Sequence, residues 1–285
     1  CTGRVTDHLV DNHTDGAYTV LRFVMDCPKE SKTLDLGYSL FFDLDPTHRG
    51  LLRLEYQGQT RTAIFSPDQA IQRFELAVIH PWRQLLDFGH EGVWHIWIGF
   101  DHILFLLSLL LPSVLKRESG HWQAVLSFRV AFWDVLKIVT AFTLAHSITL
   151  SLASLGIVQL PSRWVESGIA ASIVLAALNN IYPLFVGRRW IVAFAFGLIH
   201  GFGFASVLMD LGLPQGALLM ALVGFNLGVE AGQLAIVSVF LPLAYGLRFS
   251  WFYQRLTLVL GSFVVITLAS IWMVERMFNL KLLAF

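Results

Sequence analysis

The chain has 285 residues, of which 55% are hydrophobic and only 14% charged, and its formal net charge is zero. This composition is too apolar for a soluble globular protein and indicates a membrane protein. A zero net charge offers no argument for binding nucleic acid, and we expect no such partner. Of the 40 acidic and basic residues, 21 lie within residues 1–90, which predicts two regions that face different solvents.

The polar N-terminal region has the pattern of β-structure. Residues 17–26 place apolar and polar side chains alternately, the period of a half-buried strand. Residues 38–44, 50–57 and 59–65 are also rich in strand-forming residues, with breaks at Asp45-Pro46 and Gln57-Gly58. We therefore predict a small antiparallel β-domain over residues 1–78, most simply a sandwich.

The only two cysteines, Cys1 and Cys27, lie in this region. The chain begins like a mature N-terminus, without a basic start or an apolar run, so we expect residues 1–90 to be translocated. In an oxidising compartment Cys1 and Cys27 can form a disulfide. The alternative is that Cys1 is lipidated and Cys27 is free; we favour the disulfide.

An apolar region follows the β-domain. Residues 79–92 contain Trp82, which suits the membrane–water interface, and are predicted to be an interfacial linker. Residues 93–285 are predicted to be an all-α membrane domain of six transmembrane helices, each about long enough to cross ~30 Å of hydrocarbon. The predicted spans are residues 94–114, 132–157, 164–186, 190–211, 217–246 and 256–277.

The basic residues that flank these spans predict the orientation, because cytoplasmic loops are enriched in Lys and Arg. With the N-terminal domain outside, the cytoplasmic loops hold Lys116, Arg117, Arg129, Arg188, Arg189, Arg248 and Arg255. The outer loops and tail then hold only Arg163, Arg276 and Lys281. We predict a multi-pass protein of the bacterial inner membrane with its N-terminal domain and C-terminus extracytoplasmic.

Several ionisable residues fall inside the predicted spans, and we single out His95, Asp101, His102, His146, His200 and Glu230. A charged group near the bilayer centre costs at least ~2.5 kcal/mol, so such residues indicate function. On one continuous helix, His95 and His102 would lie only ~20° apart. His146, His200 and Glu230 fall near the middle of other spans, so four helices direct polar groups to one depth.

Metal binding is the chemistry that suits these side chains. Neutral imidazole binds nickel, cobalt or zinc, and a carboxylate offsets the charge of the cation, whereas calcium and magnesium require more oxygen ligands. Expected outer hydrogen-bond partners are Asn226, Gln233, Thr143, Ser147 and Asn179, with Glu166, Ser167, Ser172 and Asn180 as further candidates. The nearby glycines at 197, 201, 203, 224, 228 and 232 are predicted to permit close helix packing.

Four motifs carry a family resemblance. They are His95-x5-Asp101-His102, Thr143-Leu-Ala-His146-Ser147, Gly197-Leu-Ile-His200-Gly201-Phe-Gly203 and Asn226-Leu-Gly-Val-Glu230. With these motifs, residues 90–275 resemble the HupE/UreJ family, which is similar to nickel and cobalt permeases. The resemblance implies uptake of nickel or cobalt. The chain differs from the shortest members of the family by its N-terminal β-domain.

Three functions remain open from the sequence. The first is a permease for a divalent transition metal, with membrane lipid and the metal ion as partners and no nucleotide. The second is an intramembrane metal-dependent hydrolase or transferase, in which Glu230 or Asp101 acts as the base. The third is an accessory or assembly subunit that recruits a periplasmic protein through residues 1–78. We favour the permease and therefore do not expect an enzyme.

Overall fold

The computed structural model describes residues 1–280 except for short gaps at 13–16, 28–32, 46–47, 57–58, 76–80, 119–120, 183, 186 and 211–214. The chain divides into two compact units. The first comprises Cys1–Gln84 and Ser206–Met220, and the second comprises Leu85–Ala205 and Ala221–Phe285. Each unit is described by itself below.

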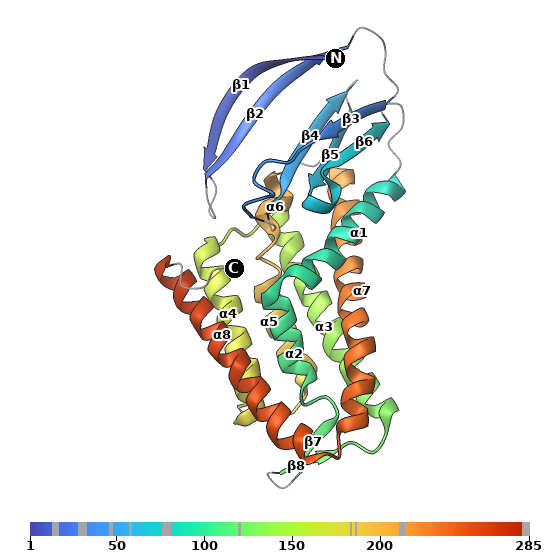
Figure 1. Cartoon of the computed structure of the whole chain (residues 1–285), viewed down its shortest axis with the longest axis vertical. Coiled ribbons are helices and arrows are strands. Elements are labelled where there is room, and N and C mark those ends of the chain that lie inside the picture. Colours follow the sequence, from blue (N-terminus) through green and yellow to red (C-terminus); the bar gives the residue numbers. More distant parts are fainter. Residues whose placement is uncertain are drawn as a thin grey trace. The chain divides into compact units, whose positions relative to one another are not determined.

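The first unit contains the predicted antiparallel β-structure (Figure 1). Its strands are β1 (Thr2–Asn12), β2 (Ala17–Asp26), β3 (Thr33–Gly37), β4 (Gly50–Tyr56), β5 (Gln59–Phe65) and β6 (Ile71–Glu75), with a 3-10 turn at Pro67–Gln69. They pair as β1–β2, β3–β6 and β4–β5. Among the described residues these strands form separate two-stranded sheets, so the antiparallel pairing is confirmed and the sandwich is not.

A disulfide between Cys1 and Cys27 closes the open end of the β1–β2 hairpin, where Thr2 pairs with Asp26. The β3–β6 pair is held by Arg73, which donates from Nε and Nη2 to the Asp35 carboxylate at 2.7 and 2.9 Å. The hydrogen bond from Arg73 lowers the pKa of Asp35.

The prediction of a strand over residues 38–44 is wrong. Leu44 N and Asp45 N both donate to Phe41 O, which makes a turn, and Phe41 has a positive φ of 63°. The prediction of a strand rested on the aromatic residues of this segment. In the structure these residues pack against one another instead. The Tyr38 ring lies 5.5 Å from that of Phe42 and 6.0 Å from that of Phe65, so side-chain packing overrides the local strand preference.

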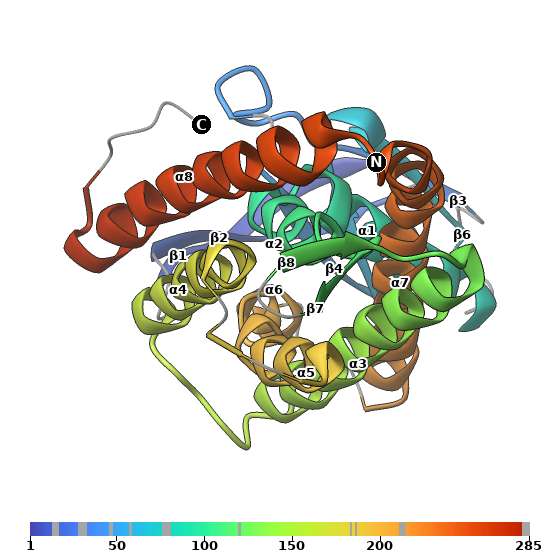
Figure 2. The same cartoon turned by 90° about the horizontal axis from the view of Figure 1, so that it is seen from below.

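The second unit is built from helices. Its elements are α1 (Pro81–Ile98), α2 (Phe100–Leu110), β7 (Leu115–Glu118), β8 (His121–Ala124), α3 (Phe128–Ser154), α4 (Ser162–Ile181), α5 (Arg189–His200), α7 (Gln215–Leu247), a π-helical segment (Phe252–Thr257) and α8 (Leu258–Phe278). The first turn of α1, the start of α7 and all of α6 (Ala205–Asp210) after Ala205 belong to the first unit. Figure 2 shows α2 in the middle, surrounded by α3, α4, α5, α7 and α8.

Among the residues that the structure describes, four helices are long and apolar enough to cross a membrane: Phe128–Ser154, Ser162–Ile181, Leu218–Leu247 and Phe252–Phe278. A fifth crossing is formed if the bent pair Trp82–Ile98 and Phe100–Leu110 counts as one span. The chain is therefore a multi-pass membrane protein. Six continuous spans are not confirmed, because the span predicted at 190–211 is a 12-residue helix, α5, followed by a turn and the short α6.

The first predicted span, 94–114, is not one helix. The chain bends by 70° between α1 and α2, and Gly99 at the break has an extended backbone, with φ −71° and ψ 96°. A Cβ on Gly99 would lie 2.5 Å from His95 O and 3.1 Å from both Asp101 Oδ1 and His102 Nδ1. Glycine is therefore required at this close approach of backbone and side chains.

Glycines bring the helices that carry polar residues close together, as predicted. A Cβ at Gly228 in α7 would overlap the Gly89 carbonyl of α1, and a Cβ at Gly201 after α5 would overlap the His146 carbonyl of α3. Such small residues let backbones touch in a membrane, where packing is a main source of helix association. The contacts place the middle of α1 beside α7 and the end of α5 beside α3.

Several basic side chains of this unit gather around β7 and β8. Arg117 and Arg189 both approach the Trp122 ring of β8, at 5.6 and 5.9 Å, and Arg248 donates to Val125 O at 2.9 Å. We call this the β7–β8 end. At the other end Arg276 pairs with Glu166 at 3.1 Å.

Candidate metal site

Four histidines from four helices meet in the interior of the second unit. They are His95 at the end of α1, His102 in the first turn of α2, His146 in α3 and His200 at the end of α5. The His102 ring centroid lies 4.4 Å from that of His95, 5.3 Å from that of His200 and 6.3 Å from that of His146. His102, His146 and His200 are 5%, 0% and 1% exposed, so protein and not solvent surrounds these rings.

Two groups of side chains have the spacing of a metal site. One is His95, His102 and His146, and the other is Asp101, His102 and His200; within each group the ligand atoms lie within 4.8 Å of one another. Ligands of a tetrahedral metal with bonds of ~2.1 Å lie roughly 3.4 Å apart. Movements of about 1 Å by the side chains would therefore close either group around one ion.

Each of the four histidines has a buried ring nitrogen without a hydrogen-bond partner. These atoms are His95 Nε2, His102 Nε2, His146 Nε2 and His200 Nδ1. A buried polar atom that makes no hydrogen bond costs about 1–3 kcal/mol, so four of them in one place require an explanation. A metal ion bound by their lone pairs provides one.

The hydrogen bonds of His200 determine which of its nitrogens is free to bind. Ser172 Oγ donates to Ile169 O at 2.7 Å, so toward His200 Nε2, 2.9 Å away, it can only accept. Nε2 of His200 therefore carries the proton, and the lone pair lies on the unpartnered Nδ1.

Two other histidines are held in the same way. Asn226 Nδ2 donates to Leu222 O at 2.8 Å, which turns the amide oxygen toward His146 Nδ1 at 3.3 Å. His102 Nδ1 lies 3.0 Å from Asp101 Oδ1. Both Nδ1 atoms therefore donate, and both lone pairs lie on Nε2, the atom without a partner. Partners of this kind orient histidine ligands in metal sites.

Replacement of Asn226 by leucine is expected to weaken metal binding by roughly 10–100-fold, the usual cost of losing such an outer partner. Leucine is of similar size but cannot accept from His146 Nδ1, which leaves the ring free to rotate. Isothermal titration of the purified protein with nickel measures the change. Asn226→Asp, which keeps the acceptor, should retain most of the affinity; equal affinity in all three proteins contradicts this role for Asn226.

The structure does not bring all predicted site residues into the cluster. The Glu230 carboxylate accepts from Thr140 Oγ1 at 2.7 Å and belongs to neither group. Gln233 accepts from Thr143 Oγ1 at 3.1 Å, and Ser147 Oγ donates to Thr143 O within its own helix. Asn179 accepts from Phe185 N at 2.7 Å near the far end of α4.

Sequence reasoning missed the aromatic surroundings of the cluster and the role of Gly99. The Phe204 and Phe225 rings stack at 4.3 Å and lie 5.0 and 5.2 Å from the His95 ring. Their apolar character made them indistinguishable from residues that face lipid. The glycine between His95 and Asp101 was a usable signal, since glycine inside a helical pattern often marks a break.

The apolar helices define this chain as a multi-pass membrane protein. The bent pair α1–α2 contributes two of the four clustered histidines, which form a candidate intramembrane metal site. The model of one protein family, HupE / UreJ protein, matches residues 71–276, and the chain belongs to that family. Membership implies a function related to metal transport. No curated protein and no solved structure matches the chain.

Proposed function

We propose that the protein is a membrane permease for a divalent transition metal, with nickel or cobalt as the first candidates. The observation that carries the proposal is the convergence of four buried histidine nitrogens without partners. Imidazole nitrogens favour first-row transition metals over calcium and magnesium, which prefer oxygen. The family supports the same class of substrate.

In this proposal the ion is the cargo and the two groups of ligands are successive positions for it. His102 belongs to both groups, so an ion can exchange His95 and His146 for Asp101 and His200 without leaving His102. The Asp101 carboxylate supplies a negative charge that offsets part of the ion's lost hydration. The helix break at Gly99 supports this role, because transporters commonly place ion sites at interrupted helices.

Glu230 is proposed to act beside this path. It lies at the middle of the apolar part of α7, is partly exposed, and is held by Thr140. A carboxylate at that depth is expensive, which favours a role in coupling metal movement to proton movement. Direct binding of the metal by Glu230, as predicted from the sequence, is a second proposal for this residue.

The proposed setting is the bacterial inner membrane, with the β7–β8 end in the cytoplasm. The grouping of Arg117, Arg189 and Arg248 at that end supports this orientation. Residues 1–78 and the C-terminus then lie outside. Residues 1–78 remain a candidate for recruiting an extracytoplasmic protein.

Transport by the purified protein in lipid vesicles tests the proposal. We expect time-dependent accumulation of nickel or cobalt above the level of protein-free vesicles, driven by an imposed membrane potential or pH gradient. The vesicles should show little accumulation of magnesium or calcium. Metal that binds the protein in a fixed ratio without accumulating in the lumen would contradict the permease and favour an enzyme or accessory subunit.

A further inference from the structure

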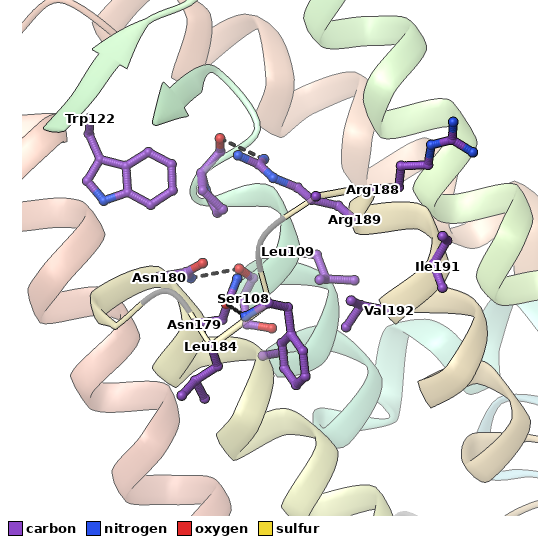
Figure 3. Close-up of a pocket in the computed structure, with 14 residues that line it drawn as sticks. Ser108, Leu109, Trp122, Asn179, Asn180, Leu184, Arg188, Arg189, Ile191 and Val192 are labelled. Carbon is purple, nitrogen blue, oxygen red and sulfur yellow. Dashed lines mark hydrogen bonds between the residues drawn. The ribbon is translucent and has the colours of Figure 1, made fainter. Parts of the chain in front are cut away.

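The second unit contains a cavity of about 390 Å³ near the β7–β8 end (Figure 3). Ser108 and Leu109 of α2, Asn179 and Asn180 of α4, and Ile191 and Val192 of α5 line it, together with Trp122, Arg188 and Arg189. None of the histidines lines this cavity. It is therefore a separate space, lined by apolar and polar side chains, that lies beside Arg188 and Arg189.

Helix spacing relates this cavity to the histidine cluster. On α2 and α5 the chain passes from a cluster residue to a second residue one turn away and then, after another turn, to the cavity. These series are His102, Phe105 and Leu109 on α2, and His200, Phe196 and Val192 on α5. On α4, Ala176 lies one turn from Ser172 and already lines the cavity. On α3, Phe142 lies one turn from His146. The cavity and the cluster are thus separated by one layer of side chains.

That layer contains three aromatic rings, Phe105, Phe142 and Phe196, and Phe105 contacts the other two. The Phe105 ring lies 5.1 Å from Phe142 and 6.0 Å from Phe196. On the cluster side Phe105 and Phe142 lie 4.8 and 5.2 Å from the His200 ring. On the cavity side Phe196 lies 6.2 Å from Phe185, which lines the cavity.

We propose that the cavity is a release site for the hydrated divalent cation, and that the Phe105–Phe142–Phe196 layer is the closed barrier between it and the histidine cluster. This inference rests on the proposed function. The three rings are at most 8% exposed, so the layer holds no open passage for water or ions in this state. Passage requires the rings to move.

The cavity has the size and chemistry of a release site. At ~30 Å³ per water it has room for about a dozen waters, enough for a cation with a full hydration shell. Its neutral oxygen-bearing side chains, those of Ser108, Asn179 and Asn180, supply only weak ligands for a cation. Arg189 is held by the carbonyls of Pro112 and Leu115 at 3.0 and 3.2 Å, so its positive charge is fixed beside the cavity and shortens the stay of a cation.

Cysteine labelling tests the barrier without relying on transport. Cys1 and Cys27 are joined in a disulfide, so an introduced cysteine is the only free thiol. Val192→Cys reports on the cavity and Ser172→Cys on the cluster. A positively charged methanethiosulfonate reagent is applied to vesicles from the β7–β8 face. We expect Val192→Cys to react and Ser172→Cys to react at least about tenfold more slowly, a barrier difference of about 1.4 kcal/mol.

Removal of a ring should open the layer. In a Phe105→Ala or Phe196→Ala background, Ser172→Cys should react from the same face at a rate that approaches that of Val192→Cys. Val192→Cys in each background shows that the fold survives. The proposed barrier would be overturned if both reporters react equally in the otherwise unchanged chain. It would also be overturned if Ser172→Cys stays protected in both alanine backgrounds. Loss of transport with these labelling results intact would instead overturn the proposed function.

Discussion

Replacement of His102 by alanine is expected to abolish metal accumulation in vesicles and to lower the affinity for nickel by at least about 100-fold, the upper limit for loss of an outer partner alone. His102 belongs to both groups of ligands, and its ring contacts those of His95 and His200. Neither group keeps three ligands without it. Vesicle uptake and titration calorimetry measure the two effects.

His90→Ala is the matched control for this replacement. His90 lies in α1, stacks on Trp94 at 6.1 Å and is half exposed, and it belongs to neither group. It should leave both affinity and uptake near the level of the unchanged protein. Normal uptake by His102→Ala, in protein that reaches the membrane in equal amount, would remove the histidine cluster from the mechanism.

Gly99→Ala is expected to reduce metal affinity at least about tenfold, a cost of about 1.4 kcal/mol, although it adds only one methyl group. The Cβ would press on His95 O, Asp101 Oδ1 and His102 Nδ1. The chain can relieve that overlap only by moving the Asp101–His102 pair or by changing the bend between α1 and α2. Both movements separate ligands that now lie within 4.8 Å of one another.

Gly246→Ala provides the control for the methyl group itself. Gly246 lies in α7, and an added Cβ there meets no atom within 4 Å. That change should keep full metal affinity and raise thermal stability slightly, since alanine is favoured over glycine in a helix by about 0.5–1 kcal/mol. If Gly99→Ala and Gly246→Ala bind metal equally well, the bend at Gly99 does not position the site.

The histidines could be predicted from sequence because the free-energy cost of placing a polar side chain in an apolar membrane segment can be recognised without knowing the fold. A polar side chain in a long apolar run needs a partner, and His95, His102, His146 and His200 stood out for that reason. The structure brings these four together. Ser172 could be named only as one of several candidates, because its pairing with His200 depends on the packing of α4 against α5.

The shape of the first membrane segment could not be predicted in the same way. A continuous helix places His95 and His102 on one face but about 10 Å apart along its axis, whereas the bend at Gly99 brings their rings to 4.4 Å. The polar pattern of the sequence fits either form. The close approach of His95 O to Gly99 exists only in the folded backbone. For Glu230 the depth in the membrane could be predicted but the direction of the side chain could not, and the structure directs it to Thr140.

X-ray absorption at the metal edge of purified, nickel-loaded protein tests the central claim most directly. The account predicts that at least three imidazole rings coordinate the ion in the unchanged protein and that fewer do so in His102→Ala. A first shell made only of oxygen ligands, or a spectrum unchanged by His102→Ala, would contradict the claim that the four clustered histidines hold the metal.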